Sequence, residues 1–420
     1  MYLKRLIESE IVLGLKTSGA ILVSGPKYCG KSTTCALFAK SSIALDTDEI
    51  IQLVQIDPRI ALEGAVPHLI DEWQEVTDIW NHVKSICSKQ GDFGMFILTG
   101  SATPPDQQGI HHSGAGRIAP IIMRPCSLYE SLESKGTVSL MGLFDNPDYD
   151  VHDLNDERTL YEAAHEIVRG GWPQSLKAEP GLSDQVTRNY YNGLFNFHDS
   201  NNPEFRKLNP GILIALLKSY ARHVSSEATN ATLMKDVKAN GRATFDDETF
   251  TRYSSALKDL FIVYDMDSWN PNLRSKIAVQ SIPVRHFYDP SLACMALGIS
   301  EEDLLRDPNT MGLFFKDLAC RDISIYSMAK EGKISHYRDS TNLECDIVLH
   351  LNDGRWAAIE VKLGGEKLVQ EGITNLKKFR NRVDTQKENK PSFLMVLTAK
   401  GPAYKSEDGV YVVPINLLKP

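Results

Sequence analysis

One loop motif near the N-terminus constrains this chain more than any other feature of its sequence. The pattern G-x-x-x-x-G-K-[ST] is matched at every fixed position by Gly25-Pro26-Lys27-Tyr28-Cys29-Gly30-Lys31-Ser32. The motif follows an apolar run at 20–24 and precedes a helical pattern at 31–40, which is the strand–loop–helix context that a phosphate-binding loop (P-loop) requires. A glycine turn without a ligand is the alternative.

Each part of this loop has a chemical task in nucleotide binding. The glycines allow backbone N–H groups to point at phosphate oxygens, and the N-terminus of the following helix adds a favourable dipole. Lys31 reaches the β- and γ-phosphates, and the hydroxyl of Ser32 is a ligand for Mg²⁺. We therefore predict ATP and Mg²⁺ as cofactors, held by the loop and the first helical turn: Gly25, Pro26, Lys27, Tyr28, Cys29, Gly30, Lys31, Ser32 and Thr33.

Two adjacent carboxylates end a second apolar run about 40 residues after the loop. Residues 67–70 read Pro-His-Leu-Ile and lead into Asp71 and Glu72. Asp71 is expected to hold Mg²⁺ together with Ser32, and Glu72 to polarise the attacking water as the catalytic base. A solvated turn is the usual role of such a pair, but its combination with a complete P-loop favours hydrolysis over nucleotide storage.

Further polar residues are candidates for the reaction. The next apolar run ends in Leu98-Thr99-Gly100-Ser101, where Thr99 or Ser101 is placed to hydrogen-bond to the γ-phosphate. Arg117 follows Gly114-Ala115-Gly116 and is a candidate arginine finger, because a guanidinium at the γ-phosphate offsets transition-state charge. A surface arginine in the Gly- and Pro-rich stretch 100–120 is the alternative.

The wider pattern predicts an α/β fold with more than one domain. Short apolar runs at 42–45, 66–70 and 94–99 alternate with helical segments, which is typical of a parallel sheet with helices on both faces. A chain of 420 residues exceeds one ordinary hydrophobic core, so two or three domains are expected.

The composition argues against a membrane-spanning protein, a secreted protein and a protein that coats nucleic acid. No stretch of 18 uncharged apolar residues is present, so no membrane partner is expected. Acidic residues interrupt the N-terminus where a secretory signal needs an apolar stretch, and the seven scattered cysteines form no C-x-x-C pair, so a cytoplasmic location is expected. The net charge of -8 argues against a chain that coats nucleic acid over its whole surface.

The remainder of the chain has two further patterns. Helical segments at 211–224, 230–239 and 246–260, followed by Phe261-Ile262-Val263-Tyr264, outline a winged helix-turn-helix, with Thr251, Arg252, Ser254 and Ser255 on the recognition helix. A protein-interaction module is the alternative. From residue 286 a second α/β pattern follows, with helices at 311–321 and 366–382 and strands near 333–337, 344–350, 355–362 and 393–398.

An ordered series of motifs resembles a known group, the prokaryotic AAA-type ATPases that carry a C-terminal domain of unknown function with a restriction-endonuclease-like core. The series comprises Gly25–Thr33, Asp57-Pro58, Leu69–Gln74, Leu98–Ala102, Gly114–Arg117, Arg124–Glu130, Gly170–Pro173 and the run from His336 to Lys362. The resemblance implies an AAA-like ATPase core with a helical lid at 1–205, a winged-helix domain at 206–285 and an endonuclease-like α/β domain at 286–420. It also implies a homo-oligomeric ring, in which Arg117 completes the site of a neighbouring subunit.

In the C-terminal domain, Glu344-Cys345-Asp346 followed by Glu360-Val361-Lys362 looks like the nuclease signature of such folds. Asp346 and Glu360 would bind a second Mg²⁺, and Lys362 would orient water or stabilise the phosphate. Alternating acids on a solvent-exposed strand are the alternative. Phe315 stands where related sequences show glutamate, so a domain that grips DNA without cutting it is also possible, with Lys377, Lys378, Arg380 and Arg382 as phosphate contacts.

Three functions are compatible with these features. The first is an ATP-hydrolysing motor that binds duplex or branched DNA and remodels it or translocates on it. The second is an ATP-gated switch in a defence or regulatory system, and the third is an ATP-regulated nuclease. We rank the motor first, because Glu72 supplies a hydrolytic acid and no other catalytic set is evident.

Overall fold

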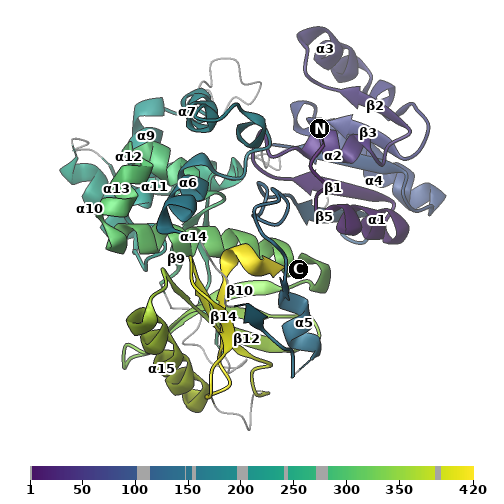
Figure 1. Cartoon of the computed structure of the whole chain (residues 1–420). Helices are drawn as coiled ribbons and strands as arrows, with labels where there is room; N and C mark the ends of the chain where they lie inside the picture. The colour runs from purple at the N-terminus through teal and green to yellow at the C-terminus, as the bar shows by residue number, and fades with distance from the viewer. Residues whose placement is uncertain are drawn as a thin grey trace. The chain divides into compact units, whose positions relative to one another are not determined.

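The computed structural model describes residues 2–101, 114–146, 148–153, 158–195, 207–240, 245–270, 282–383 and 389–420. The chain forms two compact units (Figure 1). The first consists of Met1–Pro125, Asn192–Leu213 and Thr251–Ile262, and the second of Cys126–Tyr191, Ile214–Phe250 and Val263–Pro420. Most of the stretch predicted as a Gly- and Pro-rich loop, residues 102–113, lies outside the described residues.

A five-stranded sheet forms the centre of the first unit. Its spatial order is β2 (Ser41–Ala44), β3 (His68–Asp71), β4 (Phe96–Gly100), β1 (Ala20–Ser24) and β5 (Ile118–Ile122). All neighbouring pairs are parallel, so the carboxyl ends of the strands lie along one edge. The register pairs Thr99 with Asp71 on one side and with Val23 on the other, which brings the ends of β1, β3 and β4 together.

The helices of this unit pack on the sheet through apolar residues. Helix α1 (Glu8–Thr17) contacts β1 and β5, and α2 (Lys31–Ala36) contacts β3 and β4. Helices α3 (Asp48–Ile56) and α4 (Asp78–Gln90) and the short turns η1 (Pro58–Leu62) and η2 (Trp73–Glu75) share one buried apolar cluster with the sheet. The parallel α/β core predicted from the alternating runs is therefore present.

Two details of this unit differ from the prediction. Helix α2 ends at Ala36, although the helical pattern extended to residue 40. Strand β5 begins within the last residues of the stretch predicted as a loop, and it contains Pro120, a residue that disfavours strands. Because β5 is an edge strand that pairs only with β1, it tolerates a residue that has no N–H to donate.

A mixed seven-stranded sheet dominates the second unit. Its order is β10 (Lys333–Arg338), β11 (Glu344–His350), β12 (Trp356–Lys362), β13 (Leu394–Thr398), β15 (Tyr411–Pro414), β14 (Ala403–Lys405) and β7 (His152–Asp153). Strands β12, β13 and β15 are parallel, and the other neighbours are antiparallel. Helices α14 (Pro308–Tyr326) and α15 (Glu366–Arg382) both contact β12.

The boundary between the units differs from the predicted boundary at residue 205. Strand β7 pairs with β14, and β6 (Val138–Ser139) pairs in parallel with β16 (Leu418–Lys419). Because these strands come from the segment after Pro125, residues 126–191 belong to the unit that contains the C-terminal sheet. Pairing between strands far apart in sequence leaves no local signal, which is why composition alone did not place this boundary.

The remaining elements are mostly helical. They are α5 (Leu140–Asp145), α6 (Leu160–Arg169), η3 (Ser175–Lys177), α7 (Ser183–Gly193), α9 (Pro210–Arg222), α10 (Asn230–Ala239), α11 (Asp247–Asp259), the antiparallel pair β8 (Val263–Met266) and β9 (Val284–Phe287), α12 (Pro290–Leu297), α13 (Glu301–Arg306), η5 (Met328–Lys330) and η6 (Ile415–Leu417). Within the described ranges, no helix is both long and apolar enough to cross a membrane.

Candidate functional site

The phosphate-binding loop connects β1 to α2 at the carboxyl edge of the parallel sheet. Gly30 has φ +102° and precedes α2, a left-handed conformation that favours glycine. A Cβ on Gly25 would lie 2.1 Å from the carbonyl oxygen of Met123, so only glycine fits at this close approach to the end of β5. Lys31 is 4% exposed and donates to the carbonyl oxygens of Gly25 and Pro26, each at 2.9 Å, so its ammonium lies inside the loop.

Asp71 joins the loop to the neighbouring strand ends. The Ser32 hydroxyl donates to Asp71 Oδ1 at 2.9 Å, and the Thr99 hydroxyl donates to the same oxygen. Both expected Mg²⁺ ligands therefore lie side by side, which fits the donor set for one hard cation. The sequence predicts that Thr99 or Ser101 contacts the γ-phosphate, and in this structure the Thr99 hydroxyl donates to Asp71.

Glu72 lies immediately beyond this group and has its own partners. Its φ of +55° is left-handed, an uncommon conformation for a residue with a side chain. Glu72 Oε2 accepts hydrogen bonds from the Ser101 hydroxyl at 2.9 Å and from the Gln74 amide. Ser101, the other predicted γ-phosphate sensor, is thus a partner of the predicted base.

Arg5 is a loop contact that sequence reasoning missed. Its side chain is buried, and its guanidinium donates to the carbonyl oxygens of Cys29 and Arg124, both at 2.7 Å. Arg5 thereby connects the segment before α1, the P-loop and the end of β5. Nothing in the local sequence distinguishes this arginine, because both acceptors are backbone atoms.

Tyr28 and its neighbour Lys27 are the exposed residues of the loop at residues 25–32. Tyr28 is 62% exposed and has φ +63°, which is unusual for a tyrosine. Its side chain therefore lies at the surface, next in sequence to the buried Cys29 of the loop.

Arg117 lies at the amino-terminal end of the parallel strands, whereas the P-loop lies at their carboxyl-terminal end. It directly precedes β5, and its carbonyl accepts from the N–H of Ala20, the first residue of β1. The length of β1 separates it from the P-loop by roughly 15 Å. Its exposed side chain donates to Ser88 at 3.2 Å. Arg117 is therefore remote from the P-loop of this chain.

The predicted acids of the C-terminal sheet lie together but are already paired. Asp346 contacts the ammonium of Lys316 at 2.5 Å, and Glu360 contacts that of Lys362 at 2.9 Å. Burial and the charge of Asp346 raise the pKa of Glu360 to about 7. Burial also opposes ionisation of Asp346, but the two lysines hold the pKa of this carboxyl below its usual value.

The residue of α14 that faces these acids is Lys316. From the sequence, Phe315 was expected at this position, where related sequences show glutamate, and the structure corrects this. Phe315 is fully buried, one position earlier on the helix. The side chain directed at Asp346 is a cation, whereas a metal ligand would be an acid. The residues present therefore do not fit a second Mg²⁺ site at Asp346 and Glu360.

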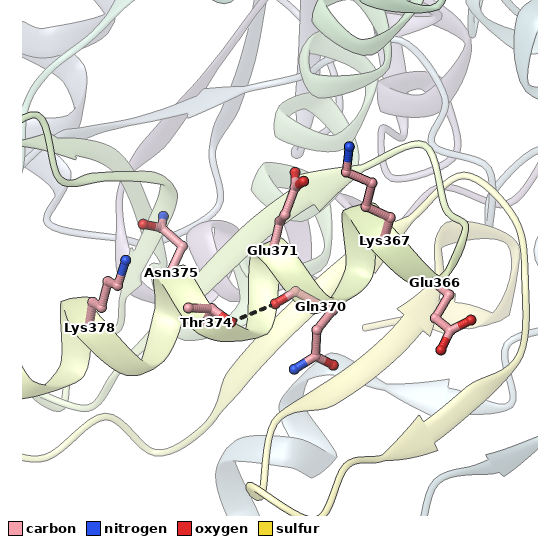
Figure 2. Close-up of a pocket in the computed structure, with 7 residues that line it drawn as sticks. All are labelled: Glu366, Lys367, Gln370, Glu371, Thr374, Asn375 and Lys378. Atoms are coloured by element: carbon pink, nitrogen blue, oxygen red, sulfur yellow. Dashed lines mark hydrogen bonds between the residues drawn. The ribbon is translucent and has the colours of Figure 1, made fainter.

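The basic residues of α15 do not form an unbroken phosphate-binding surface. Lys377 pairs with Asp408 at 2.6 Å, and Arg382 with Asp339 at 3.2 Å. A hollow of about 630 Å³ over this helix has both charges among its lining residues (Figure 2): Glu366, Lys367, Gln370, Glu371, Thr374, Asn375 and Lys378. Carboxylates in this lining oppose the binding of a nucleic-acid backbone.

The predicted recognition helix, α11, is partly turned inward. Thr251, Arg252 and Ser255 are exposed. Ser254 is buried and donates to the carbonyl oxygen of Thr251 at 3.1 Å, so it is not available to a partner.

Among the described residues, two clusters of catalytic or metal-ligand residue types form from residues far apart in the sequence. His165, Asp184 and Glu301 bring one ligand atom each to within 4.8 Å of one another, and His165 Nδ1 lies 2.5 Å from Glu301 Oε1. This group connects α6, α7 and α13, and its wide sequence spacing gave no signal.

The second cluster has the order of a Cys-His-Asp triad. His286 Nδ1 lies 2.7 Å from Asp317 Oδ1, and its Nε2 lies 4.0 Å from Cys320 Sγ. All three residues are fully buried, and the ring of Tyr264 stacks on His286. Because no substrate can reach the sulfur, the cluster contributes to the core.

Three stretches of the chain match models of protein families. Residues 17–132 match an AAA domain. Residues 162–303 match DUF8612 and residues 312–418 match DUF4143, both domains of unknown function. The AAA match spans the parallel sheet and, with the site geometry, identifies this part of the chain as a P-loop ATPase domain of AAA type. The matches name neither a winged helix nor an endonuclease fold, so both remain predictions.

Among solved structures, the chain is similar to a Walker-type ATPase of Pyrococcus abyssi. The identity is 14% and the TM-score 0.44, over 70% of this chain and 96% of that chain. No curated protein matches the sequence.

Proposed function

We propose that the protein binds ATP with Mg²⁺ and hydrolyses it to ADP and phosphate. The observation that carries the proposal is the contact between Ser32 and Asp71, which places two hard oxygen ligands beside the P-loop. Mg²⁺ bound there would neutralise charge on the phosphates, while Lys31 would exchange its carbonyl partners for phosphate oxygens. The γ-phosphate would lie near the carboxyl ends of β3 and β4.

In this proposal Glu72 is the general base. It directly follows Asp71, and its hydrogen bonds to Ser101 and Gln74 leave the carboxylate oriented by two neutral donors. A carboxylate held in this way can accept a proton from water once substrate is in place. Ser101 and Gln74 are then positioning residues, since they contact Glu72.

We further propose that DNA is the partner on which hydrolysis acts, either as duplex or as branched DNA. Helices α9, α10 and α11 followed by β8 and β9 have the chain order of a winged helix-turn-helix, and Thr251, Arg252 and Ser255 on α11 are exposed. Lys378 and Arg380 on α15 supply two further cations. This support is narrower than the sequence indicated, because Lys377 and Arg382 are paired with acids.

The test is the ATPase rate of the wild type and of Glu72→Gln, without DNA and with single-stranded, duplex or branched DNA at low salt. The wild type should hydrolyse ATP, and Glu72→Gln should bind ATP normally while its rate falls by at least about 100-fold, the range for loss of a general base. An unchanged rate in Glu72→Gln would refute its role. A slow rate that no DNA stimulates would instead support the nucleotide-gated switch.

We also propose that Arg117 acts on the site of a neighbouring subunit in a homo-oligomeric ring. Its place at the amino-terminal end of the strands, away from the P-loop, and the exposure of its side chain support this arrangement. Arg117→Ala and Glu72→Gln should each be inactive alone, but mixing them should restore part of the rate, because Glu72→Gln subunits donate intact arginines to Arg117→Ala sites. A mixture that remains inactive after subunit exchange would contradict the proposal.

A further inference from the structure

The acid pair of the C-terminal sheet is built into the centre of the second unit. Asp346 lies near the start of β11 and Glu360 near the end of β12, and the register that pairs Ile347 with Ile359 makes the two acids cross-strand neighbours. Both side chains are nearly inaccessible, at 8% and 3% exposure. Two carboxylates buried this close together require compensating positive charge.

Both oxygens of Asp346 have a donor from the protein. Oδ1 lies 2.5 Å from the ammonium of Lys316, and Oδ2 accepts from the backbone N–H of Val361 at 2.8 Å. Lys316 comes from α14, a helix of 19 residues that packs on β12. A long rigid helix therefore delivers this ammonium to the acid pair.

Both oxygens of Glu360 are also occupied. Oε2 lies 2.9 Å from the ammonium of Lys362, and Oε1 accepts from the side-chain amide of Asn375 at 2.8 Å. Asn375 donates in addition to the carbonyl oxygen of Glu344 at 2.7 Å, which fixes the amide between α15 and β11. Every carboxylate oxygen of the pair is thus satisfied without a metal ion.

We propose that Lys316 is an internal counter-ion that takes the place of a divalent cation at Asp346 and Glu360, so that this domain keeps its fold without metal and does not cleave DNA. Lys316 and Lys362 together supply the two positive charges that one divalent ion would bring. Mg²⁺ binds carboxylate oxygens at about 2.0–2.1 Å, and an ammonium already on Asp346 Oδ1 would repel it. Lys316 is a structural residue in this arrangement, since it contacts neither substrate nor reacting atoms.

The decisive experiment measures the melting temperature of the full chain, without nucleotide, with and without millimolar Mn²⁺. Lys316→Met removes the ammonium and keeps an unbranched apolar side chain. Lys333→Met is the matched control, because Lys333 lies in the same unit and pairs with Asp267 at 3.5 Å where both side chains are exposed. Asp346→Asn, alone and combined with Lys316→Met, assigns any effect of metal to this site.

We expect Mn²⁺ to shift the melting temperatures of the wild type and of Lys333→Met no more than that of Asp346→Asn, which keeps the cation ligands Ser32 and Asp71. Lys316→Met should melt roughly 5–15 °C lower, because it leaves a buried charge without its partner, and Mn²⁺ should recover much of that loss. The recovery should disappear in the double variant.

Three results would overturn the proposal. The first is a rise in the wild-type melting temperature with Mn²⁺ that Asp346→Asn abolishes. The second is metal-dependent DNA cleavage by the wild type that Asp346→Asn abolishes. The third is a folded Lys316→Met protein whose melting temperature does not respond to Mn²⁺. The wild-type measurement decides the first point even if Lys316→Met does not fold.

Discussion

Replacing Thr99 by Val tests how the structure holds Asp71. The exchange removes one hydroxyl and preserves the branched shape of a fully buried side chain. Thr99 donates to Asp71 Oδ1, the oxygen that also accepts from Ser32. A hydrogen bond to a charged acceptor contributes about 1.5–3 kcal/mol, so the Mg²⁺ concentration for half-maximal ATPase activity should rise by roughly 10- to 100-fold.

The assay is ATP hydrolysis at fixed saturating ATP over a wide range of Mg²⁺ concentrations. Thr398→Val is the matched control, because Thr398 ends the buried strand β13 and, within the described part of the chain, its hydroxyl has no hydrogen-bond partner. This control should leave the Mg²⁺ dependence unchanged. It should raise the free energy of unfolding by about 1 kcal/mol, since an unsatisfied buried hydroxyl is removed.

The outcome separates two roles for Thr99. If Thr99→Val lowers kcat at saturating Mg²⁺ and leaves the half-maximal Mg²⁺ concentration unchanged, the hydroxyl acts on the γ-phosphate, as the sequence indicated. In that case the reasoning from its contact with Asp71 is refuted.

Two further predictions concern residues outside the sequence motifs. Arg5→Met removes both hydrogen bonds to the carbonyl oxygens of Cys29 and Arg124. The affinity for ATP, measured with a fluorescent analogue, should therefore fall about tenfold, a loss of about 1.4 kcal/mol of binding free energy. Unchanged affinity would show that the loop holds its shape without Arg5. Burial raises the pKa of Asp259 to about 6, so its contribution to stability is complete below pH 4 and is lost as pH rises through 6. The loss of unfolding free energy between pH 4 and 7 should be about 1–2 kcal/mol, a value reduced for solvent screening because the side chain is half-buried, and Asp259→Asn should remove it. Chemical denaturation that gives the same pH dependence of stability for both proteins would contradict this prediction.

The nucleotide site could be predicted because its chemistry is local in sequence. The P-loop lies within eight residues, and Asp71 and Glu72 follow a short apolar strand, so a parallel sheet brings them together whatever the rest of the chain does. The contact of Thr99 with Asp71 was not predicted, because strand position alone does not reveal which neighbour a hydroxyl meets.

Non-local features could not be predicted in this way. Lys316 and Asp346 are separated by the rest of α14, η5 and β10, and only the packing of α14 on β12 shows that an ammonium faces the acids. Arg117 was predicted as an arginine finger. Its place at the amino-terminal end of the strands follows from the direction of β5, which runs parallel to β1. Pro120 in β5 concealed an edge strand within a stretch rich in turn residues.

The pairing of β6 with β16 also sets an order for folding during synthesis. Ser139 donates to the carbonyl oxygen of Pro420 at 2.7 Å, a contact between residues 281 positions apart. At ribosomal rates of roughly 5–20 residues per second, β6 waits on the order of 15–60 s for its partner strand. The parallel sheet of residues 20–122 has all its strands long before then. Nascent chains should therefore acquire the nucleotide site first and carry an incomplete second unit until β16 emerges, and deletion of residues 418–420 should leave β6 without its partner strand.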